Sequence, residues 1–274
     1  MKTPTIPMLA KRTISAIIFF IIGLALIFSG GWVYTIGVSL ILSFAVWEFI
    51  HLFKGYDPNP YPVLIGTFGV MVSTYLDDPI ITSLSYTISI FAILTLAIQN
   101  YEKQESTTAF NATFALASLL FVTFLGSFII KIRFLPNGFF WIVLSIFPVG
   151  IGDIGAYAIG TYYGKHKLAP KLSPKKTIEG YIGGVLSAVV GSVLIGAISH
   201  HFVPSITIKN AVLIGSLTGL LAPFGDLSKS IFKRHFHAKD PGNLIPGHGG
   251  MLDRIDTWLW ASPIAYYLIT FLFL

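Results

Sequence analysis

The sequence predicts an all-α, polytopic integral membrane protein with about nine transmembrane helices. Of its 274 residues, 54% are hydrophobic and only 11% are charged, whereas roughly a quarter are charged in an average soluble domain. The mean hydropathy is +0.76. The 12 acidic and 18 basic residues are too few to cover a soluble core of this size. Most of the chain is therefore expected to face lipid.

Nine apolar stretches are long enough to cross the hydrocarbon core of a bilayer, which takes about 20 helical residues. They lie at residues 13–30, 32–53, 60–76, 80–98, 111–131, 137–163, 178–199, 211–232 and 255–274. Gly and Pro interrupt the third and the sixth. The first stretch lacks the small-residue cleavage site of a signal peptide, and a second stretch follows at once. We therefore expect it to be retained as a helix.

The basic residues predict the orientation. If the N-terminus is cytoplasmic, every Lys and Arg except Lys131, Arg133 and Lys209 falls on the cytoplasmic side, as the positive-inside rule requires. This asymmetry accounts for the net charge of +6 without nucleic acid as a partner. Because the chain has no cysteine, thiolate chemistry is excluded, and any bound metal must take oxygen or imidazole ligands.

A first polar cluster lies in the eighth stretch, within APFGDLSKSIFKR. The proline and glycine before Asp226 predict a kink. Beyond it, Asp226, Ser230 and Lys233 share one helix face at i, i+4 and i+7, an arrangement suited to phosphate and metal binding. The alternative is an interfacial salt bridge between Asp226 and Lys229, or a Ser230 that caps a helix. An ionised Asp in a bilayer costs about 2.5–3.5 kcal/mol on insertion scales, so Asp226 needs a partner or a wet cavity.

The ninth stretch supplies two further carboxylates near its start. Asp253 and Asp256 share a helix face at i and i+3, close to the positive end of that helix. If the last two helices are antiparallel neighbours, Asp226, Asp253 and Asp256 converge. Clustered hard oxygen ligands favour Mg²⁺ or Mn²⁺ over zinc. The sequence therefore predicts a divalent-metal site made by these three residues.

The loop between these helices, KRHFHAKDPGNLIPGHGG, is basic and rich in glycine. Its glycines permit close backbone approach to a ligand. Lys233, Arg234, Lys239 and His248 give it positive charge. We expect His248, which stands between glycines, to be functional, and the two histidines near the start of the loop to be merely exposed. Next to a carboxylate cluster, such a loop suits phosphoryl or nucleotidyl transfer.

A second basic loop, GKHKLAPKLSPKKTIEG, occupies residues 164–180. Within this segment, Thr177 lies just before a new helix, which makes a candidate anion site at a helix N-terminus. Lys167 and Lys176 are its candidate substrate-binding cations, and topology-setting charge alone is the alternative reading. Asp153, in GIGDIGAYAIG of the sixth stretch, either lines the site or pairs with a lysine.

These motifs resemble the signature of the phosphatidate cytidylyltransferase (CDP-diacylglycerol synthase) family. The matching residues, at fixed spacing, are Ser230-Ile-Phe-Lys-Arg, Lys239-Asp240, Gly242, Pro246, His248-Gly-Gly and Asp253-Arg-Ile-Asp256. The loop at 164–180 resembles a companion segment of that family, so the resemblance covers about residues 150–257. The departure is at Gly152-Asp153-Ile154-Gly155, where members often read Ser-Asp-Thr-Gly, which leaves two hydroxyl groups missing.

The resemblance implies a reaction in phospholipid biosynthesis. The phosphate of phosphatidic acid attacks the α-phosphorus of CTP, giving CDP-diacylglycerol and pyrophosphate, with Mg²⁺ and, in some members, a monovalent cation such as K⁺. It also implies a homodimer surrounded by membrane lipids, active on the cytoplasmic side of a bacterial inner or plasma membrane. Residues 1–132 then form N-terminal transmembrane helices, and residues 133–274 form the catalytic helices with their cytoplasmic loops, all within one membrane domain.

The resemblance also implies roles for individual residues. Asp226 and Asp253 bind the metal, and Asp256 completes or orients that site. With Lys233 these three make the catalytic set. The implied phosphate-binding residues are Lys233, Arg234, Lys239 and His248. The further substrate-binding candidates are Ser230, Lys167, Lys176 and Thr177. No protein nucleophile is needed, because the lipid phosphate is already negatively charged and the enzyme aligns it and neutralises charge.

Two other functions are compatible with parts of the sequence. A related membrane transferase, such as a CTP-dependent polyprenol or phytol kinase or an archaeol cytidylyltransferase, would share the helices and the nucleotide chemistry. A transporter would use intramembrane acids as an ion path. The chain shows no internal repeat and its acids gather at one face, which favours an enzyme.

Overall fold

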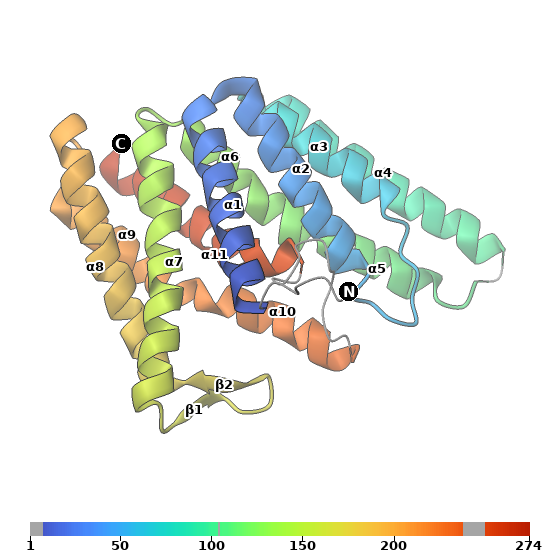
Figure 1. Cartoon of the computed structure of the whole chain (residues 1–274). Coiled ribbons are helices and arrows are strands. Elements are labelled where there is room, and N and C mark those ends of the chain that lie inside the picture. Colours follow the sequence, from blue (N-terminus) through green and yellow to red (C-terminus); the bar gives the residue numbers. More distant parts are fainter. Residues whose placement is uncertain (1–7, 104, 238–249) are drawn as a thin grey trace, which may run out of the picture. The chain divides into compact units, whose positions relative to one another are not determined.

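The computed structural model describes residues 8–103, 105–237 and 250–274. It divides the chain into two units. The first comprises Met1–Leu119 with Phe236–Ile255, and the second comprises Leu120–His235 with Asp256–Leu274. Helices make up most of the described chain (Figure 1), which confirms the predicted all-α class.

The first unit is built from the N-terminal helices. They are α1 (Met8–Ser29), α2 (Gly31–Ile50), α3 (Tyr61–Tyr75), α4 (Pro79–Glu102) and α5 (Thr108–Ser118). Gly30 and Gly31 have φ angles of 59° and 51°, a region that glycine enters without strain, and this permits the abrupt turn from α1 to α2. Asp78 caps α4, because its carboxylate accepts the N–H groups of Ile80 and Ile81 at 2.8 and 3.0 Å.

The second unit contains the remaining helices and a β-hairpin. Its elements are η1 (Leu119–Phe124), α6 (Leu125–Phe134), α7 (Gly138–Tyr163), β1 (Lys167–Ala169), β2 (Ser173–Thr177), α8 (Ile178–Phe202), α9 (Ile208–Leu221), α10 (Pro223–His235), α11 (Leu252–Leu268) and η2 (Ile269–Phe273). The segment η1 is π-helical and begins at the boundary between the units, and the first turn of α11 belongs to the first unit. Figure 1 shows α7, α8 and α9 side by side, with the hairpin connecting α7 to α8.

Small residues bring α7 and α8 together. A Cβ atom added to Gly184 would lie 2.9 Å from the Cβ of Ala156 and 3.0 Å from the carbonyl oxygen of Gly152. Such close contact between backbones is typical of helix pairs in membranes, where packing replaces the hydrophobic effect as the attractive force. The opposite face of α8 carries an exposed apolar stripe at a spacing of four residues. It consists of Ile178, Ile182, Leu186, Val190, Leu194 and Ile198.

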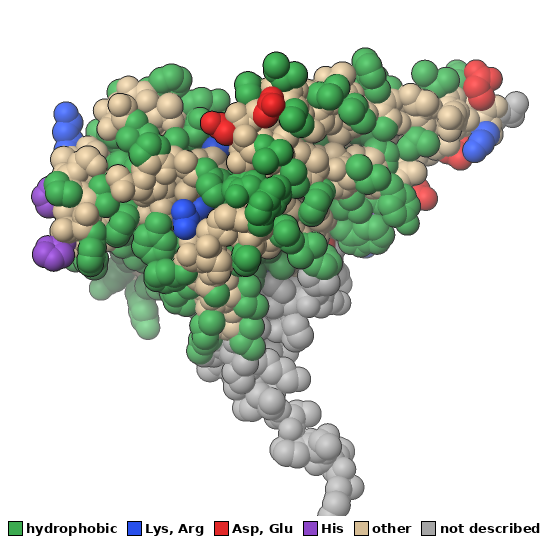
Figure 2. Space-filling view, turned by 90° about the horizontal axis from the view of Figure 1, so that it is seen from above, with side chains coloured by type: hydrophobic (Ala, Val, Ile, Leu, Met, Phe, Trp, Pro, Cys, Tyr) green, Lys and Arg blue, Asp and Glu red, His purple; other side chains and the backbone are tan. Residues whose placement is uncertain are grey.

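All nine predicted stretches fall on helices, and six helical segments among the described residues are long and apolar enough to cross a membrane. These segments are Gly31–Ile50, Pro79–Glu102, Thr108–Phe134, Gly138–Tyr163, Ile178–Phe202 and Ile208–His235. Two shorter apolar helices, Ile17–Ser29 and Tyr61–Tyr75, accompany them. Figure 2 shows hydrophobic side chains over much of the face in view. The chain is thus an integral membrane protein, and the count of nine spans stays a prediction.

Two local expectations can be compared with the structure. The predicted kink is present, since α9 ends at Leu221 and α10 begins at Pro223. The basic loop at 164–180 is more ordered than expected: β1 and β2 pair in antiparallel register, with Lys167 opposite Thr177. This hairpin was not predicted, because its strands are short and follow no alternation of apolar and polar residues.

A buried acid of the first unit holds the start of α11. Glu48, on α2, is 4% exposed, and its Oε2 accepts the N–H of Leu252 at 2.8 Å. This satisfies one of the N–H groups that a helix start leaves without a partner in the helix. Gly250 fits against the same carboxylate, since an added Cβ would lie 2.7 Å from Cδ and 2.8 Å from Oε1 of Glu48.

We therefore expect Gly250→Ala to lower the free energy of unfolding by about 1–3 kcal/mol through overpacking. Combining it with Glu48→Ala should cost less than the two single changes added together, because the methyl group then has space. Unfolding midpoints of the four proteins in detergent measure this coupling. Strictly additive effects would show that the carboxylate does not constrain Gly250.

Candidate functional site

Four charged side chains form a chain of alternating sign in the second unit. Lys176 Nζ lies 2.7 Å from Asp226 Oδ2, and Asp226 Oδ1 lies 3.3 Å from Lys229 Nζ. Lys229 also pairs with Asp256. The inner pair is buried, with side chains of Lys229 and Asp256 exposed by 4% and 5%, whereas those of Lys176 and Asp226 are exposed by 30% and 31%. The cluster thus runs from the surface into the protein interior.

Three elements position this cluster. Asp226 lies in the first turn of α10, where the positive end of the helix favours a carboxylate, and Lys229 follows one turn later. Asp256 comes from the start of α11 and accepts the N–H of Thr257 at 2.7 Å. Gly225 allows the two helices to meet, because a Cβ there would collide with the backbone carbonyl of Asp256.

The buried ammonium of Lys229 is the electrostatic centre of the cluster. A buried carboxylate is costly unless it is paired and hydrogen-bonded, and Lys229 provides that charge for two carboxylates at once. Asp226 and Asp256 thus converge on one cationic group, and a divalent-metal site at their oxygens stays a prediction. Among the described residues, no three His, Asp or Glu side chains form a group that could hold a metal.

The predicted site residues that follow Asp226 in the chain lie on α10, on α11 or outside the described residues. Ser230, Lys233 and Arg234 lie on α10 after Asp226, and Asp253 lies on α11 within the first unit, one turn before Asp256. A metal role for Asp253 therefore stays a prediction. Lys239 and His248 lie outside the described residues. The structure brings together Asp226, Asp256 and Lys176.

Lys229 is the residue whose role the sequence analysis missed. Its distance of three residues from Asp226 pointed only to the alternative, a local salt bridge, and that ion pair is confirmed. The second partner, Asp256, lies 27 residues further along the chain. No local pattern could indicate that contact, since it depends on how α10 and α11 pack.

The hairpin is tied to α10 at two points. Lys176, on β2, makes the ion pair with Asp226. Arg234 Nε, near the end of α10, donates to the carbonyl oxygen of Leu172 in the turn between the strands, at 3.1 Å. The basic segment at 164–180 thus contacts the helix that carries Asp226 near both of its ends.

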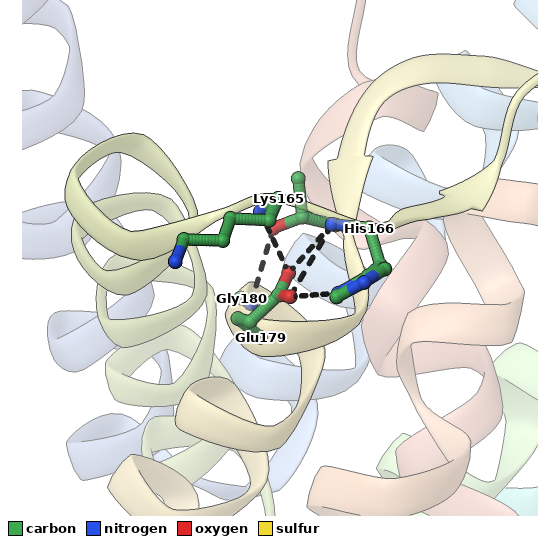
Figure 3. A network of polar contacts seen from close by, with 5 residues as sticks. Lys165, His166, Glu179 and Gly180 are labelled. Atoms are coloured by element: carbon green, nitrogen blue, oxygen red, sulfur yellow. Dashed lines mark hydrogen bonds and ion pairs between the residues drawn. The ribbon is translucent and has the colours of Figure 1, made fainter.

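A second network fastens the hairpin to α8 (Figure 3). The carboxylate of Glu179 accepts the backbone N–H groups of Lys165 and His166 at 3.0 and 3.2 Å, and it lies 2.6 Å from His166 Nδ1. Thr177 caps α8, because its Oγ1 accepts the N–H of Gly180 at 3.1 Å. The predicted helix N-terminus at Thr177 is therefore confirmed. Thr177 accepts the N–H of Gly180, and Glu179 accepts those of Lys165 and His166, so these three N–H groups already have partners.

A cavity of about 490 Å³ lies between α7, α8, α9 and the hairpin. Its volume falls within the roughly 300–1,000 Å³ typical of small-molecule sites. Its polar lining residues include Asp153, Tyr157, Thr161, Lys167, Lys176 and Tyr181. Asp153 thus lines a cavity, and its role at the site stays a prediction. Lys176 lines the same cavity and pairs with Asp226 of the charged cluster.

Comparisons with known proteins agree with these motifs. The sequence model of the cytidylyltransferase family matches residues 10–272. The chain is 34% identical over 183 residues to the phosphatidate cytidylyltransferase of Bacillus subtilis (strain 168), covering 66% of this chain and 67% of that protein. Proteins of the same name from Synechocystis sp. and Staphylococcus aureus (strain COL) are 30% and 32% identical, over 96% and 94% of this chain and 97% and 98% of their own lengths.

The buried ion pair generates a stability prediction. We expect Lys229→Met to lower the free energy of unfolding by about 3–5 kcal/mol, because it leaves the buried carboxylate of Asp256 without its cation. Lys176→Met, which removes a partly exposed partner, should cost about 1 kcal/mol or less. Thermal unfolding in detergent with EDTA compares the two variants. Equal effects would contradict the central role of Lys229.

Proposed function

The chain belongs to the cytidylyltransferase family, and from this premise we propose that it is a phosphatidate cytidylyltransferase. It transfers the cytidylyl group of CTP to phosphatidic acid and releases pyrophosphate. The observation that carries this proposal is the match to relatives of that name over nearly the whole chain. The cluster of Lys176, Asp226, Lys229 and Asp256 supports it, because it joins carboxylates to a basic segment as nucleotidyl transfer requires.

The proposed reaction is a single displacement at phosphorus. An oxygen of the lipid phosphate forms a bond to the α-phosphorus of CTP. The bond from that phosphorus to the oxygen bridging to the β-phosphate breaks, and pyrophosphate leaves with the electron pair. Because both reactants are anions, the protein must align them and offset their repulsion, and no covalent intermediate with a side chain is needed.

The cations of the second unit offset this repulsion. Lys176 is partly exposed, so its ammonium can donate to a phosphate oxygen while it stays beside Asp226. Lys167 lies on the neighbouring strand and adds positive charge along the same cavity. Lys229 stays buried and keeps the two carboxylates in place. Both partly accessible lysines are therefore assigned to phosphate binding, with Thr177 at the adjoining helix start.

A divalent ion completes the proposed site. Asp226, Asp253 and Asp256 would hold Mg²⁺ or Mn²⁺, and K⁺ is the candidate for a monovalent ion. When bound, the divalent ion supplies positive charge that neutralises the phosphates and orients them. The residues proposed to bind phosphate with it are Ser230, Lys233, Arg234, Lys239 and His248.

The membrane setting follows from the two substrates. Phosphatidic acid keeps its acyl chains in lipid, whereas CTP is dissolved in the cytosol, so they meet at the cytoplasmic interface. The proposed topology has nine spans with both basic segments on that side, and the distribution of Lys and Arg supports it. We propose a homodimer on the family resemblance alone.

The reaction is tested with CTP labelled on the α-phosphate, phosphatidic acid, Mg²⁺ and purified protein in detergent. We expect the label to enter the chloroform-soluble product, and EDTA to abolish this transfer. A CTP-dependent lipid kinase would instead transfer label from the γ-phosphate. If neither label reaches the lipid in a folded, lipid-supplied protein, the proposal is wrong and transport assays in liposomes become the next test.

Asp253→Asn tests the proposed carboxylate site in the same assay. We expect kcat to decrease by roughly 10²-fold or more, the usual effect of removing one group that stabilises charge in a transition state. Asp78→Asn is the matched control, because it makes the same chemical change at the cap of α4, where Asn also caps well. Activity retained by Asp253→Asn would exclude that residue from the metal site.

A further inference from the structure

The cavity of the second unit contains a carboxylate that the proposed chemistry does not use. Asp153 lies on α7, within a segment apolar and long enough to cross a membrane, yet it is exposed to the cavity that it lines. A carboxylate at such a position is costly unless it meets polar partners or water. Its place in the wall of a ligand-sized cavity makes it a candidate for recognition.

The cavity has a polar line along one side. Asp153, Tyr157 and Thr161 are spaced by four residues on α7 and all line the cavity, so they share one face of that helix. Eight residues of helix advance by about 12 Å. The line therefore extends from the carboxylate toward the end of α7, where the hairpin begins.

The hairpin end of the cavity is cationic. Lys167, Lys175 and Lys176 all line it, and Lys176 is paired with Asp226 of the charged cluster. Lysines in the wall at one end of a cavity suit a polyphosphate. The opposite arrangement, a carboxylate, suits a group that donates hydrogen bonds. The cavity is thus matched in charge to a molecule with phosphates at one end and an N–H donor at the other.

Aromatic side chains contribute to the walls between these ends. Tyr157 and Tyr181 both line the cavity. The hydroxyl of Tyr181 donates to the carbonyl oxygen of Leu220 at 2.7 Å, which fixes the orientation of the ring. Aromatic faces are common stacking partners for nucleobases. The cavity also has apolar lining, but the carboxylate of Asp153 is a poor neighbour for an acyl chain. Together with the lysines at the other end, it makes the nucleotide the better occupant.

We propose that this cavity holds CTP with its base toward Asp153, and that the Asp153 carboxylate accepts a hydrogen bond from the exocyclic amine of cytosine. This inference rests on the proposed function. Cytosine presents an N–H₂ donor at C4, whereas uracil presents a carbonyl oxygen there. A carboxylate therefore attracts cytosine and repels uracil, and Asp153 is the residue that selects CTP over UTP.

The test is the ratio of kcat/KM for CTP to that for UTP, measured for the wild-type protein and for Asp153→Asn. An amide can either donate or accept, so the variant should lose roughly ten- to a hundredfold of this preference. The KM for phosphatidic acid should change by less than about twofold. Asp78→Asn, remote in sequence and on α4, should keep the wild-type ratio. Unfolding midpoints in detergent confirm that both variants are folded.

A binding measurement separates this inference from the proposed function. Titration of the folded protein with CTP and with UTP, followed by calorimetry, needs no turnover. Tighter binding of CTP that Asp153→Asn abolishes supports the inference even if no lipid product forms. An unchanged preference in the variant overturns it. A raised KM for phosphatidic acid with an unchanged KM for CTP also overturns it, and assigns the cavity to the lipid.

Discussion

The charged centre of the second unit depends on one buried ammonium group. Lys229 pairs with Asp226 on its own helix and with Asp256 at the start of α11, so it neutralises two carboxylates that would otherwise repel each other. This constraint explains why Gly225 lies at the crossing of the two helices, since the carboxylates reach the same ammonium only if the backbones approach closely. Lys176, at the outer end of the cluster, is partly exposed and pairs with Asp226.

Local patterns predicted the parts of the fold that depend on neighbouring residues. The apolar stretches coincide with helices because an apolar run of this length satisfies its backbone groups in lipid only as a helix. The break at Pro223 and the cap at Thr177 follow from the chemistry of single residues. The ion pair of Asp226 and Lys229, the alternative interpretation of this segment, follows from their i, i+3 spacing, because such positions are neighbours in any helix.

Contacts between distant segments could not be predicted in the same way. Asp256 was expected beside Asp226, and both carboxylates pair with Lys229. That Lys229 contacts both of them depends on how α10 and α11 pack, which no local pattern indicates. Glu48 and Leu252 are separated by 204 positions, so no motif joins them. The hairpin was read as a loop because its order comes from tertiary contacts: Glu179 holds its first residues, and Arg234 holds its turn.

The contact between Glu48 and Leu252 has a consequence for the order of synthesis. Glu48 leaves the ribosome about 200 residues before its partner, so α2 must enter the membrane with a carboxylate whose native hydrogen bond does not yet exist. Its position two residues before the end of α2 makes this tolerable, since a side chain near a helix end can stay in the hydrated interface. A helix translated about 200 residues later therefore completes the burial of an acid in α2, and synthesis that stops before α11 leaves out the N–H group of Leu252 that this acid accepts.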